Sequence, residues 1–180
     1  MIVTETGLKG CLVIEPEVFQ DDRGWFFEAY NQKMFQEKLG KISFVQDNQS
    51  FSRRGVIRAL HYQRDDYAQA KLVRVLQGAV LDVAVDLRKD SATFGKHFAI
   101  ELTSNNKKQL FIPRGFAHGF SVLSKTAEFF YKCDNLYNKE SEGGIIFADS
   151  SLNIDWKIPE SEQIISDRDR SLPSFEKAKF

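Results

Sequence analysis

The fold and the chemistry of this chain both depend on one stretch, RRGVIRALHYQ, which covers residues 53–63. Its apolar members Val56, Ile57, Ala59 and Leu60 are typical of a β-strand, so we predict a strand over residues 56–62. The same stretch carries arginines and a histidine, which a buried strand rarely contains. We therefore ask what this strand could do with cationic and titratable side chains.

The rest of the chain repeats this pattern of short apolar or alternating segments separated by turn residues, which predicts an all-β sandwich or barrel. Residues 81–87 alternate cleanly, and Gln77-Gly78 separates them from residues 71–76, which predicts a hairpin. Further strands are expected at residues 11–15, 25–30, 44–51, 97–102, 109–112, 119–123 and 128–133. This number of strands favours a jelly roll.

Helices are expected to be few. Asn31 is suited to be the N-cap of a helix over residues 32–39, and Gly40 is suited to end it. A second helix is expected near Ser161, and the polar residues 139–144 are expected to form a surface loop. We find no internal repeat and no linker rich in Gly, Ser or Pro, so we expect one domain over residues 1–180.

The composition narrows the class of partner. The 25 basic and 25 acidic residues cancel, which argues against a general nucleic-acid binder or a polybasic membrane-surface protein and favours a small molecule. No apolar run approaches the ~20 residues of a membrane span. The two cysteines, Cys11 and Cys133, are far apart, which indicates neither a disulfide framework nor a zinc cluster. We expect a cytoplasmic protein.

Two of the three histidines have suggestive contexts. His118 ends a P-x-G-x-x-H pattern that begins at Pro113 and resembles the second motif of the cupin superfamily, in which a Pro-Gly turn places a histidine in a β-barrel. In metal cupins the first motif supplies H-x-H and a downstream glutamate, because several N and O ligands must converge on one ion. Here the first motif reads His61-Tyr62-Gln63 and the downstream position is Lys71, so we expect a metal-free barrel.

Lys71 needs an explanation of its own. Strand alternation places it on the same face as Val73 and Val75, which is expected to point inward. A buried lysine is rare unless it meets a negative charge. Together with Arg58, His61 and His118 it indicates a pocket for an anionic ligand, where it would bind a phosphate or stabilise an enolate.

Six motifs along nearly the whole chain, in order, resemble those of the dTDP-4-dehydrorhamnose 3,5-epimerase family. They are DDRGWFFE (21–28), VQDNQS (45–50), GVIRALHYQ (55–63), KLVRVLQG (71–78), PRGFAHGF (113–120) and SDRD (166–169). The resemblance implies a cupin-type jelly roll with a few short helices, without metal or cofactor and assembled as a homodimer. It also implies action on dTDP-4-keto-6-deoxy-D-glucose in dTDP-L-rhamnose biosynthesis.

The resemblance also implies catalytic roles. Inverting C3 and C5 beside the C4 carbonyl requires a base on one face and an acid on the other. His61 matches the family's base, and Asp169 matches the aspartate that holds it, although a slip of two residues would replace Asp169 by Asp167. Tyr131 matches the acid, and Lys71 matches the lysine near the C4 oxygen, where an ammonium stabilises the enolate.

The nucleotide half of the substrate requires other residues. Arginines grip diphosphate oxygens in pairs, and the resemblance assigns this role to Arg23, Arg58 and Arg168. The remaining residues that it implies in substrate binding are Phe26, Glu28, Gln46, Asn48, His118, Tyr137 and Glu142, of which Tyr137 would stack on the thymine.

One difficulty concerns Arg58 and His61, which are three residues apart and so point to opposite faces of an ideal strand. If both line one pocket, the strand is bulged or twisted, or Arg58 acts from the strand's end or across the dimer interface.

Several alternatives to the double epimerase remain open at this point. Close ones are a 5-epimerase, a 3-epimerase or a 3,4-ketoisomerase. A non-catalytic carbohydrate-binding cupin is disfavoured by the presence of base, orienting acid, tyrosine and lysine together. A metal-dependent cupin oxygenase lacks ligands.

Overall fold

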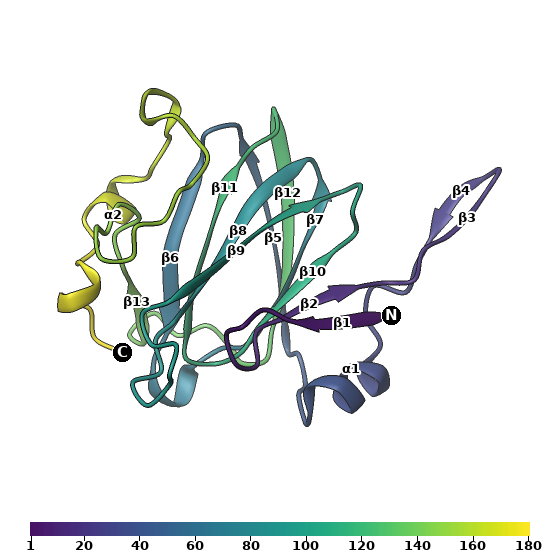
Figure 1. Ribbon diagram of the computed structural model, residues 1–180, viewed down its shortest axis with the longest axis horizontal. Helices are drawn as coiled ribbons and strands as arrows, with labels where there is room; N and C mark the ends of the chain where they lie inside the picture. Colours follow the sequence, from purple (N-terminus) through teal and green to yellow (C-terminus); the bar gives the residue numbers. More distant parts are fainter.

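The computed structural model describes residues 1–180, and most of the chain forms two facing antiparallel β-sheets (Figure 1). One sheet has six strands in the order β1 (Ile2–Glu5), β2 (Leu12–Glu15), β10 (Gln109–Ile112), β7 (Lys71–Gln77), β12 (Thr126–Cys133) and β5 (Gln46–Arg53). The other has five, in the order β13 (Glu142–Gly144), β6 (Ile57–Gln63), β11 (Phe116–Val122), β8 (Ala79–Asp86) and β9 (His97–Thr103). The expected all-β cupin-type jelly roll is confirmed.

The main core lies between the two sheets. Val73 and Val75 of β7 belong to it, together with Phe116 and Phe120 of β11 and Phe129 of β12. Each side chain in this layer loses most of its contact with water, which is the main favourable contribution to folding. The inward direction predicted for Val73 and Val75 is therefore confirmed.

Strand β8 buries both of its faces. Val80 and Ala84 point into the layer between the sheets, so Asp82 shares the interior face. The apolar residues of the other face pack outward beneath the C-terminal part of the chain, which lies against this sheet (Figure 1). The outer cluster includes Leu81, Val83 and Val85 of β8 together with Leu152, Trp156 and Ile165.

The hairpin predicted at Gln77-Gly78 is wrong. Strand β7 pairs with β10 and β12, whereas β8 pairs with β11 and β9 in the other sheet. Gly78 has a φ of +83°, and a Cβ there would lie 2.1 Å from the Thr126 carbonyl oxygen. Only glycine fits this turn. The turn carries the chain from one sheet to the other, because short-range alternation defines a strand but not its partner.

The predicted first helix is confirmed as α1 (Gln32–Leu39). The Asn31 side chain accepts a hydrogen bond from the Met34 backbone N–H, and Gly40, with a φ of +83°, donates its backbone N–H to the Gln36 carbonyl. Near Ser161 the structure has a single 3-10 turn, η2 (Glu160–Glu162). The other short helices are η1 (Asp65–Tyr67), α2 (Asp167–Arg170) and η3 (Phe175–Lys177). Neither α-helix has the length and apolar character that crossing a membrane requires.

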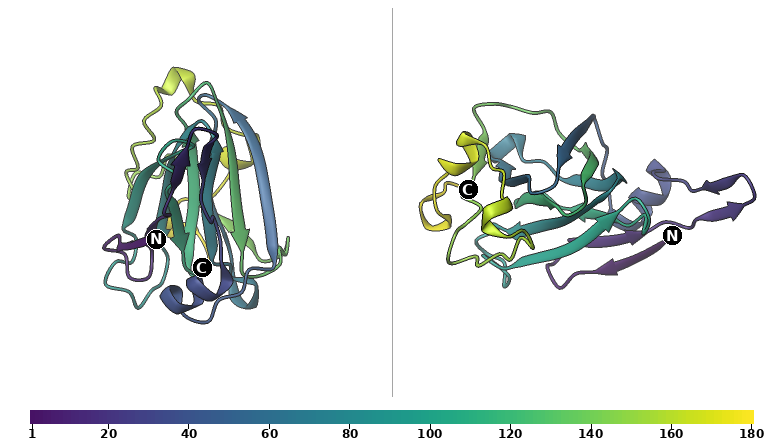
Figure 2. Two further views of the ribbon diagram at one scale, coloured as in Figure 1. Left: turned by 90° about the vertical axis from the view of Figure 1, so that its right-hand side faces the viewer. Right: turned by 90° about the horizontal axis from the view of Figure 1, so that it is seen from above.

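The N-terminal third of the chain differs most from expectation. The strand predicted over residues 25–30 is reduced to β4 (Gly24–Phe26), which pairs with β3 (Phe19–Asp21). This hairpin, which we call the arm, extends away from the body of the molecule (Figure 2). Strand β1 was also not predicted, and the surface loop predicted over residues 139–144 is wrong in part, because its last three residues form β13.

Candidate active site

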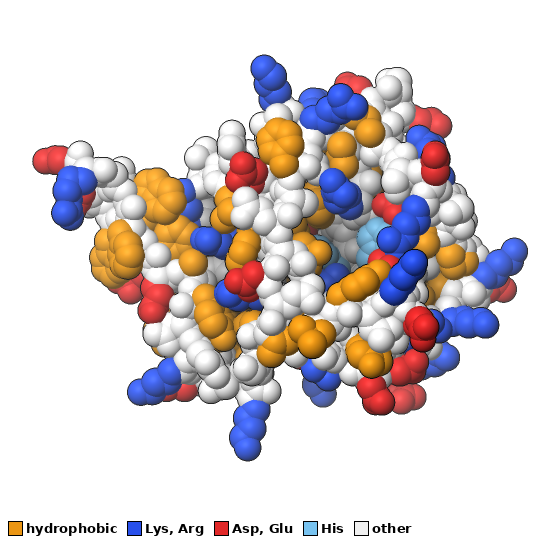
Figure 3. All heavy atoms as spheres, turned by 180° about the vertical axis from the view of Figure 1, so that it is seen from behind, with side chains coloured by type: hydrophobic (Ala, Val, Ile, Leu, Met, Phe, Trp, Pro, Cys, Tyr) orange, Lys and Arg blue, Asp and Glu red, His pale blue; other side chains and the backbone are white.

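A pocket of about 440 Å³ opens between the two sheets. The space-filling view shows histidine side chains at the bottom of this hollow and lysine or arginine side chains around its rim (Figure 3). Of the 14 residues implied by the resemblance, ten line the pocket: Asn48, Arg58, His61, Lys71, His118, Tyr131, Tyr137, Glu142, Arg168 and Asp169. Residues that the sequence did not single out, among them Ser50, Gln63 and Gln69, complete its wall.

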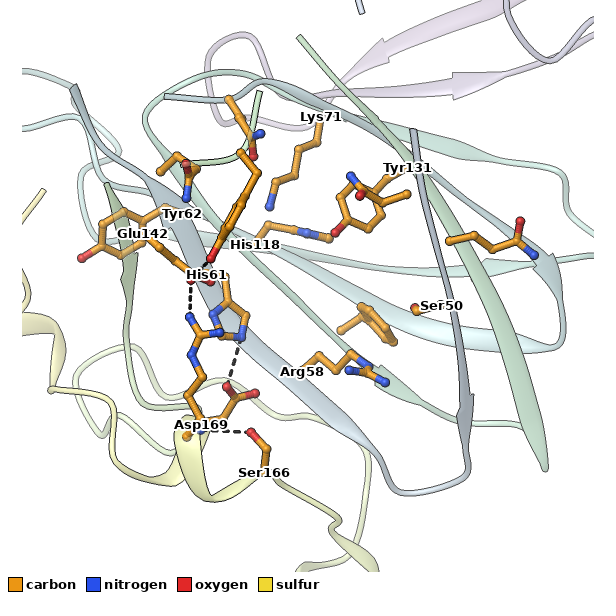
Figure 4. Close-up of a pocket in the computed structure, with 17 residues that line it drawn as sticks. Ser50, Arg58, His61, Tyr62, Lys71, His118, Tyr131, Glu142, Ser166 and Asp169 are labelled. Atoms are coloured by element: carbon orange, nitrogen blue, oxygen red, sulfur yellow. Dashed lines mark hydrogen bonds and ion pairs between the residues drawn. The ribbon is translucent and has the colours of Figure 1, made fainter. Parts of the chain in front are cut away.

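The two sheets provide opposite walls of the pocket. His61 on β6 and His118 on β11 come from the five-stranded sheet, whereas Lys71 on β7 and Tyr131 on β12 come from the six-stranded sheet. Figure 4 shows these four side chains converging on one space. A flat molecule bound between the sheets would therefore meet different functional groups on its two faces.

His61 is held by a carboxylate. Its Nε2 atom lies 3.2 Å from Asp169 Oδ1, and its Nδ1 atom has no hydrogen-bond partner. Asp169 sits in the short helix α2, which is capped by the Ser166 side chain. Burial alone would raise the pKa of Asp169, but the hydrogen bond and the charge of His61 bring it below its ordinary value. Asp167 is exposed and outside the pocket, so the structure selects Asp169 over Asp167.

A bulge in β6 explains how Arg58 and His61 reach the same pocket. Arg58 stands opposite Phe120 and His61 opposite His118, so three steps along β6 match two along β11. The peptide bond between Ala59 and Leu60 in this bulge is cis. Of the alternatives that the sequence left open for this strand, the bulge is the one found.

The bulge fits because its neighbour on β11 is Gly119. A Cβ at Gly119 would lie 2.5 Å from Ala59 Cβ and 2.8 Å from the Arg58 carbonyl oxygen. Such distances are too short for any side chain at this position. Arg58 itself is steadied by a hydrogen bond of 3.2 Å from its Nε to Ser52 Oγ.

Lys71 and Tyr131 form the opposite wall. The Lys71 ammonium lies 5.6 Å from the centre of the Tyr131 ring. Burial lowers the pKa of Lys71, and the charges of Asp82 and Glu142 oppose that effect. Burial raises the pKa of Tyr131, so its hydroxyl keeps its proton at neutral pH.

His118 has a partner that sequence reasoning missed. Its Nε2 atom lies 2.8 Å from Oδ1 of Asp82, which has no exposed surface. Burial lowers the pKa of His118, while the charge of Asp82 and the hydrogen bond to it oppose that effect. The only signal for Asp82 was its place within an alternating strand, where a polar residue is normally taken to face water.

Polar side chains surround the entrance. Glu142 forms an ion pair with Arg168 and accepts a hydrogen bond of 2.8 Å from the Tyr137 hydroxyl. Burial would raise the pKa of Glu142, but these two hydrogen bonds lower it. Gln46 lies just outside the pocket, where its side chain bonds to Asn48 and to the Tyr137 backbone N–H. These contacts connect β5 to the loop that carries Tyr137.

Besides Gln46, three more residues implied in substrate binding lie outside the pocket. Arg23 and Phe26 are on the arm and line a separate hollow there. The Arg23 side chain is 91% exposed and pairs with Asp21. Glu28 accepts a hydrogen bond from the Asn31 side chain near the start of α1. Within one chain the structure does not bring these residues to His61.

The arrangement suits proton transfer better than ion binding. No group of three or more His, Cys, Asp or Glu side chains is placed to hold a metal ion. Instead the pocket combines an imidazole oriented by a carboxylate, a protonated phenol and an ammonium, with arginines at its edge. This set of groups can remove a proton beside a carbonyl, stabilise the resulting enolate and return a proton.

Comparisons with known proteins agree with this chemistry. The family model described as dTDP-4-dehydrorhamnose 3,5-epimerase matches residues 5–177. The dTDP-4-dehydrorhamnose 3,5-epimerase of Shigella flexneri is 51% identical over 181 residues, covering all of this chain and 99% of the relative. The crystal structure of that enzyme from Elizabethkingia anophelis is 58% identical, with a TM-score of 0.95 and coverage of 98% of this chain and 97% of that one.

A further solved structure carries a bound sugar nucleotide. It is dTDP-6-deoxy-D-glucose-3,5-epimerase from Legionella pneumophila in complex with dTDP-4-keto-L-rhamnose. It is 44% identical to this chain, with a TM-score of 0.94 and coverage of 98% of this chain and 93% of that one.

Proposed function

This chain belongs to the dTDP-4-dehydrorhamnose 3,5-epimerase family and is an isomerase, and we propose that its pocket inverts C3 and C5 of dTDP-4-keto-6-deoxy-D-glucose. The observation that carries the proposal is the placement of the His61–Asp169 pair and of Tyr131 with Lys71 on opposite walls of one pocket. The product is dTDP-4-keto-L-rhamnose, as required for dTDP-L-rhamnose biosynthesis.

His61 is the proposed base. Asp169 fixes the Nε2–H form of the ring and stabilises the positive charge that arises when the ring takes up a proton. The unpartnered Nδ1 nitrogen then accepts the proton from the carbon beside the C4 carbonyl. The electron pair of the broken C–H bond moves onto the C4 oxygen and forms an enolate.

Lys71 and Tyr131 complete each inversion. The Lys71 ammonium stabilises the negative C4 oxygen, as preorganised charges do in enolate chemistry. Tyr131, whose pKa is raised by burial, gives its proton to the face opposite His61. Proton exchange with water afterwards restores the neutral imidazole and the phenol, so the enzyme is ready for the second carbon.

The polar entrance suits the nucleotide. Arg58 and Arg168 are proposed to bind the diphosphate, because a guanidinium can hold two oxygens at once. Tyr137, which is half exposed, is placed to stack on the thymine. Gln46, Asn48, His118 and Glu142 supply further hydrogen bonds to the sugar or the nucleotide.

A homodimer is proposed to complete the site. Phe19, Trp25 and Phe26 of the arm are 57%, 58% and 68% exposed, an apolar surface that a second copy would cover. The edge strand β5 adds Phe51, which is 63% exposed. In this arrangement Arg23, Phe26 and Glu28 bind the substrate held by the partner subunit.

The remaining expectations become part of the proposal. One domain over residues 1–180 is proposed to carry the activity, without a metal or an organic cofactor, because the pocket side chains suffice for each proton transfer. A cytoplasmic location is proposed, and the two unpaired, buried cysteines are compatible with reducing conditions.

The test is incubation with dTDP-4-keto-6-deoxy-D-glucose in D2O, followed by NMR of the sugar. We expect deuterium at both C3 and C5 together with L-rhamno product, and no exchange with His61→Asn. Deuterium at C5 alone or at C3 alone would indicate a mono-epimerase. Movement of the carbonyl would indicate a 3,4-ketoisomerase. No exchange at either carbon would refute proton abstraction altogether.

A further inference from the structure

Asp82 is an unusual residue for the interior of a barrel. It lies on the inward face of β8, has no exposed surface, and makes one side-chain hydrogen bond, of 2.8 Å between Oδ1 and His118 Nε2. Its other oxygen, Oδ2, is buried and has no partner. A carboxylate oxygen left unpaired in the core costs free energy, so packing alone does not account for this residue.

The surroundings of Asp82 indicate what it does. His118 connects it to the pocket, where the Lys71 side chain runs toward the His118 ring (Figure 4). No carboxylate forms an ion pair with the Lys71 ammonium, which lies 5.6 Å from the centre of the Tyr131 ring. A buried ammonium without a nearby negative charge tends to lose its proton.

We propose that Asp82 is a positioning residue, which holds His118 with its proton on Nε2 and supplies the fixed negative charge that keeps Lys71 an ammonium inside the barrel. This inference rests on the proposed function of Lys71. Because Asp82 accepts a hydrogen bond from the Nε2–H group, the Nδ1 atom of His118 is left with a lone pair, which can accept a hydrogen bond from Lys71 or from a substrate hydroxyl. The charge of Asp82 acts without touching the substrate.

Other ionisable groups face the same space. Lys71 is influenced by Cys133 on the adjacent strand β12 and by Glu142 on β13, and His118 is influenced by His61. Glu142 is already engaged by Arg168 and Tyr137, and burial raises the pKa of the Cys133 thiol. Asp82 is therefore the acid whose negative charge remains available to act on Lys71 in the interior of the barrel.

The first experiment uses the unmodified enzyme. Long-range 1H–15N NMR of protein labelled in its three histidines shows which ring nitrogen carries the proton, and His61→Asn and His97→Asn identify the signals. We expect His118 to carry its proton on Nε2 at neutral pH. A proton on Nδ1 instead would overturn the proposal, whether or not any Asp82 variant folds.

The second experiment compares the pH profile of kcat/KM for the wild type and Asp82→Asn, which keeps the shape and loses the charge. We expect the alkaline limb to move to lower pH by about one unit or more, because Lys71 then loses its proton more easily. A folded Asp82→Asn protein with an unchanged alkaline limb would overturn the proposal.

Asp86→Asn is the matched control. Asp86 is also buried on β8, but it lies outside the pocket, where it pairs with Arg88. The Asp86→Asn substitution should lower the stability of the protein and leave the alkaline limb of the kcat/KM profile unchanged. The deuterium assay on the wild type reports separately on the proposed function, so a failure of that function is distinguishable from a failure of the role of Asp82.

Discussion

His61 and His118 stand opposite each other in the antiparallel pair formed by β6 and β11, and each imidazole contacts a carboxylate of its own. The two pairs differ in environment. The His61 side chain is 26% exposed and its acid comes from a short surface helix, whereas the His118 side chain is 7% exposed and its acid is in the core. Only the first imidazole is placed to exchange protons with the solvent, which suits a base, whereas the second is suited to a fixed hydrogen bond.

The alkaline limit of activity should belong to Lys71. Burial lowers the pKa of Lys71 below its ordinary value of 10.5 and raises the pKa of Tyr131. The reaction requires both groups protonated, so a rise in pH removes the lysine proton first and kcat/KM falls. Lys71→Arg should slow the reaction by about 10- to 100-fold and abolish this limb, because a guanidinium stays charged. Initial rates across the alkaline range check this, and a limb unchanged in Lys71→Arg would contradict it.

Tyr131→Phe should separate proton removal from inversion. The base on the opposite wall is intact in this variant, so C–H exchange with D2O should continue. Inversion should slow by about 100-fold or more, because the proton donor on the far face is missing. NMR of substrate recovered at early times should therefore show deuterium with retained configuration. Equal loss of exchange and inversion would show instead that Tyr131 acts before or during proton removal.

Much of this site was predictable from the sequence because its motifs are local. Each motif can be recognised from a few neighbouring residues. This applies to the strand around His61, to the strand that begins at Lys71 and to the Pro-Gly turn before His118. The same holds for α1, whose cap and stop residues adjoin it. Local patterns of this kind survive folding because the interactions that decide them are short in range.

What could not be predicted depends on partners distant in sequence. The turn at Gly78 gave no sign that β7 and β8 join different sheets, since pairing is decided by long-range packing. Asp82 looked like the polar half of an amphipathic strand because the segment that covers the outer face of β8 comes more than 60 residues later, at Leu152, Trp156 and Ile165. The arm likewise has a contact partner distant in sequence, because the Lys107 ammonium lies 3.6 Å from the centre of the Trp25 ring.

Gly119→Ala should impair catalysis without replacing any side chain that contacts the substrate. The new Cβ would lie 2.5 Å from Ala59 Cβ, so the bulge must shift. This bulge is what directs both Arg58 and His61 toward the same pocket. A displacement of about 1 Å at a base can cost about 100-fold in rate, and we expect kcat to fall and KM to rise together. Gly7→Ala is the control for kinetics: Gly7 has a φ of +86°, so alanine strains its backbone and should lower stability, but the new Cβ meets nothing within 4 Å and kcat and KM should stay unchanged. Normal kinetics in a folded Gly119→Ala protein would show that the bulge does not set the geometry.

Asp86 should contribute to stability in a way that depends on pH. Burial would raise the pKa of Asp86, but hydrogen bonds from Arg88, Ser91 and Thr93 bring it far below its ordinary value. The folded state therefore binds this proton less readily than the unfolded state. The resulting stability is complete above the unfolded pKa of about 3.9 and is lost as the pH falls through the folded value.

Asp86→Asn should accordingly lower the free energy of unfolding by about 3 kcal/mol at pH 7, because it leaves Arg88 without its charge partner. The difference from the wild type should shrink below about pH 3.9, because the wild-type carboxyl is then protonated in the unfolded state while it is still ionised in the folded state. Urea unfolding at several pH values between neutral and about 3 measures this. A difference that stays constant with pH would mean that the ion pair is not its source.

The arm can be tested by combining two chains that are each impaired by a different substitution. Arg23→Ala removes the proposed diphosphate contact and should raise KM by about 10- to 100-fold, whereas His61→Asn removes the base. If the arm serves the partner subunit, a mixed dimer of the two variants contains one site with His61 from the first chain and Arg23 from the second. Such dimers, isolated with two different tags, should recover about half of the wild-type activity at low substrate concentration, because one of two sites is intact.

If the arm served its own chain, every site in the mixed dimer would lack one of the two groups, and the activity would stay as low as in the parents. The comparison therefore distinguishes an arm that completes a neighbouring site from one that only holds two copies together.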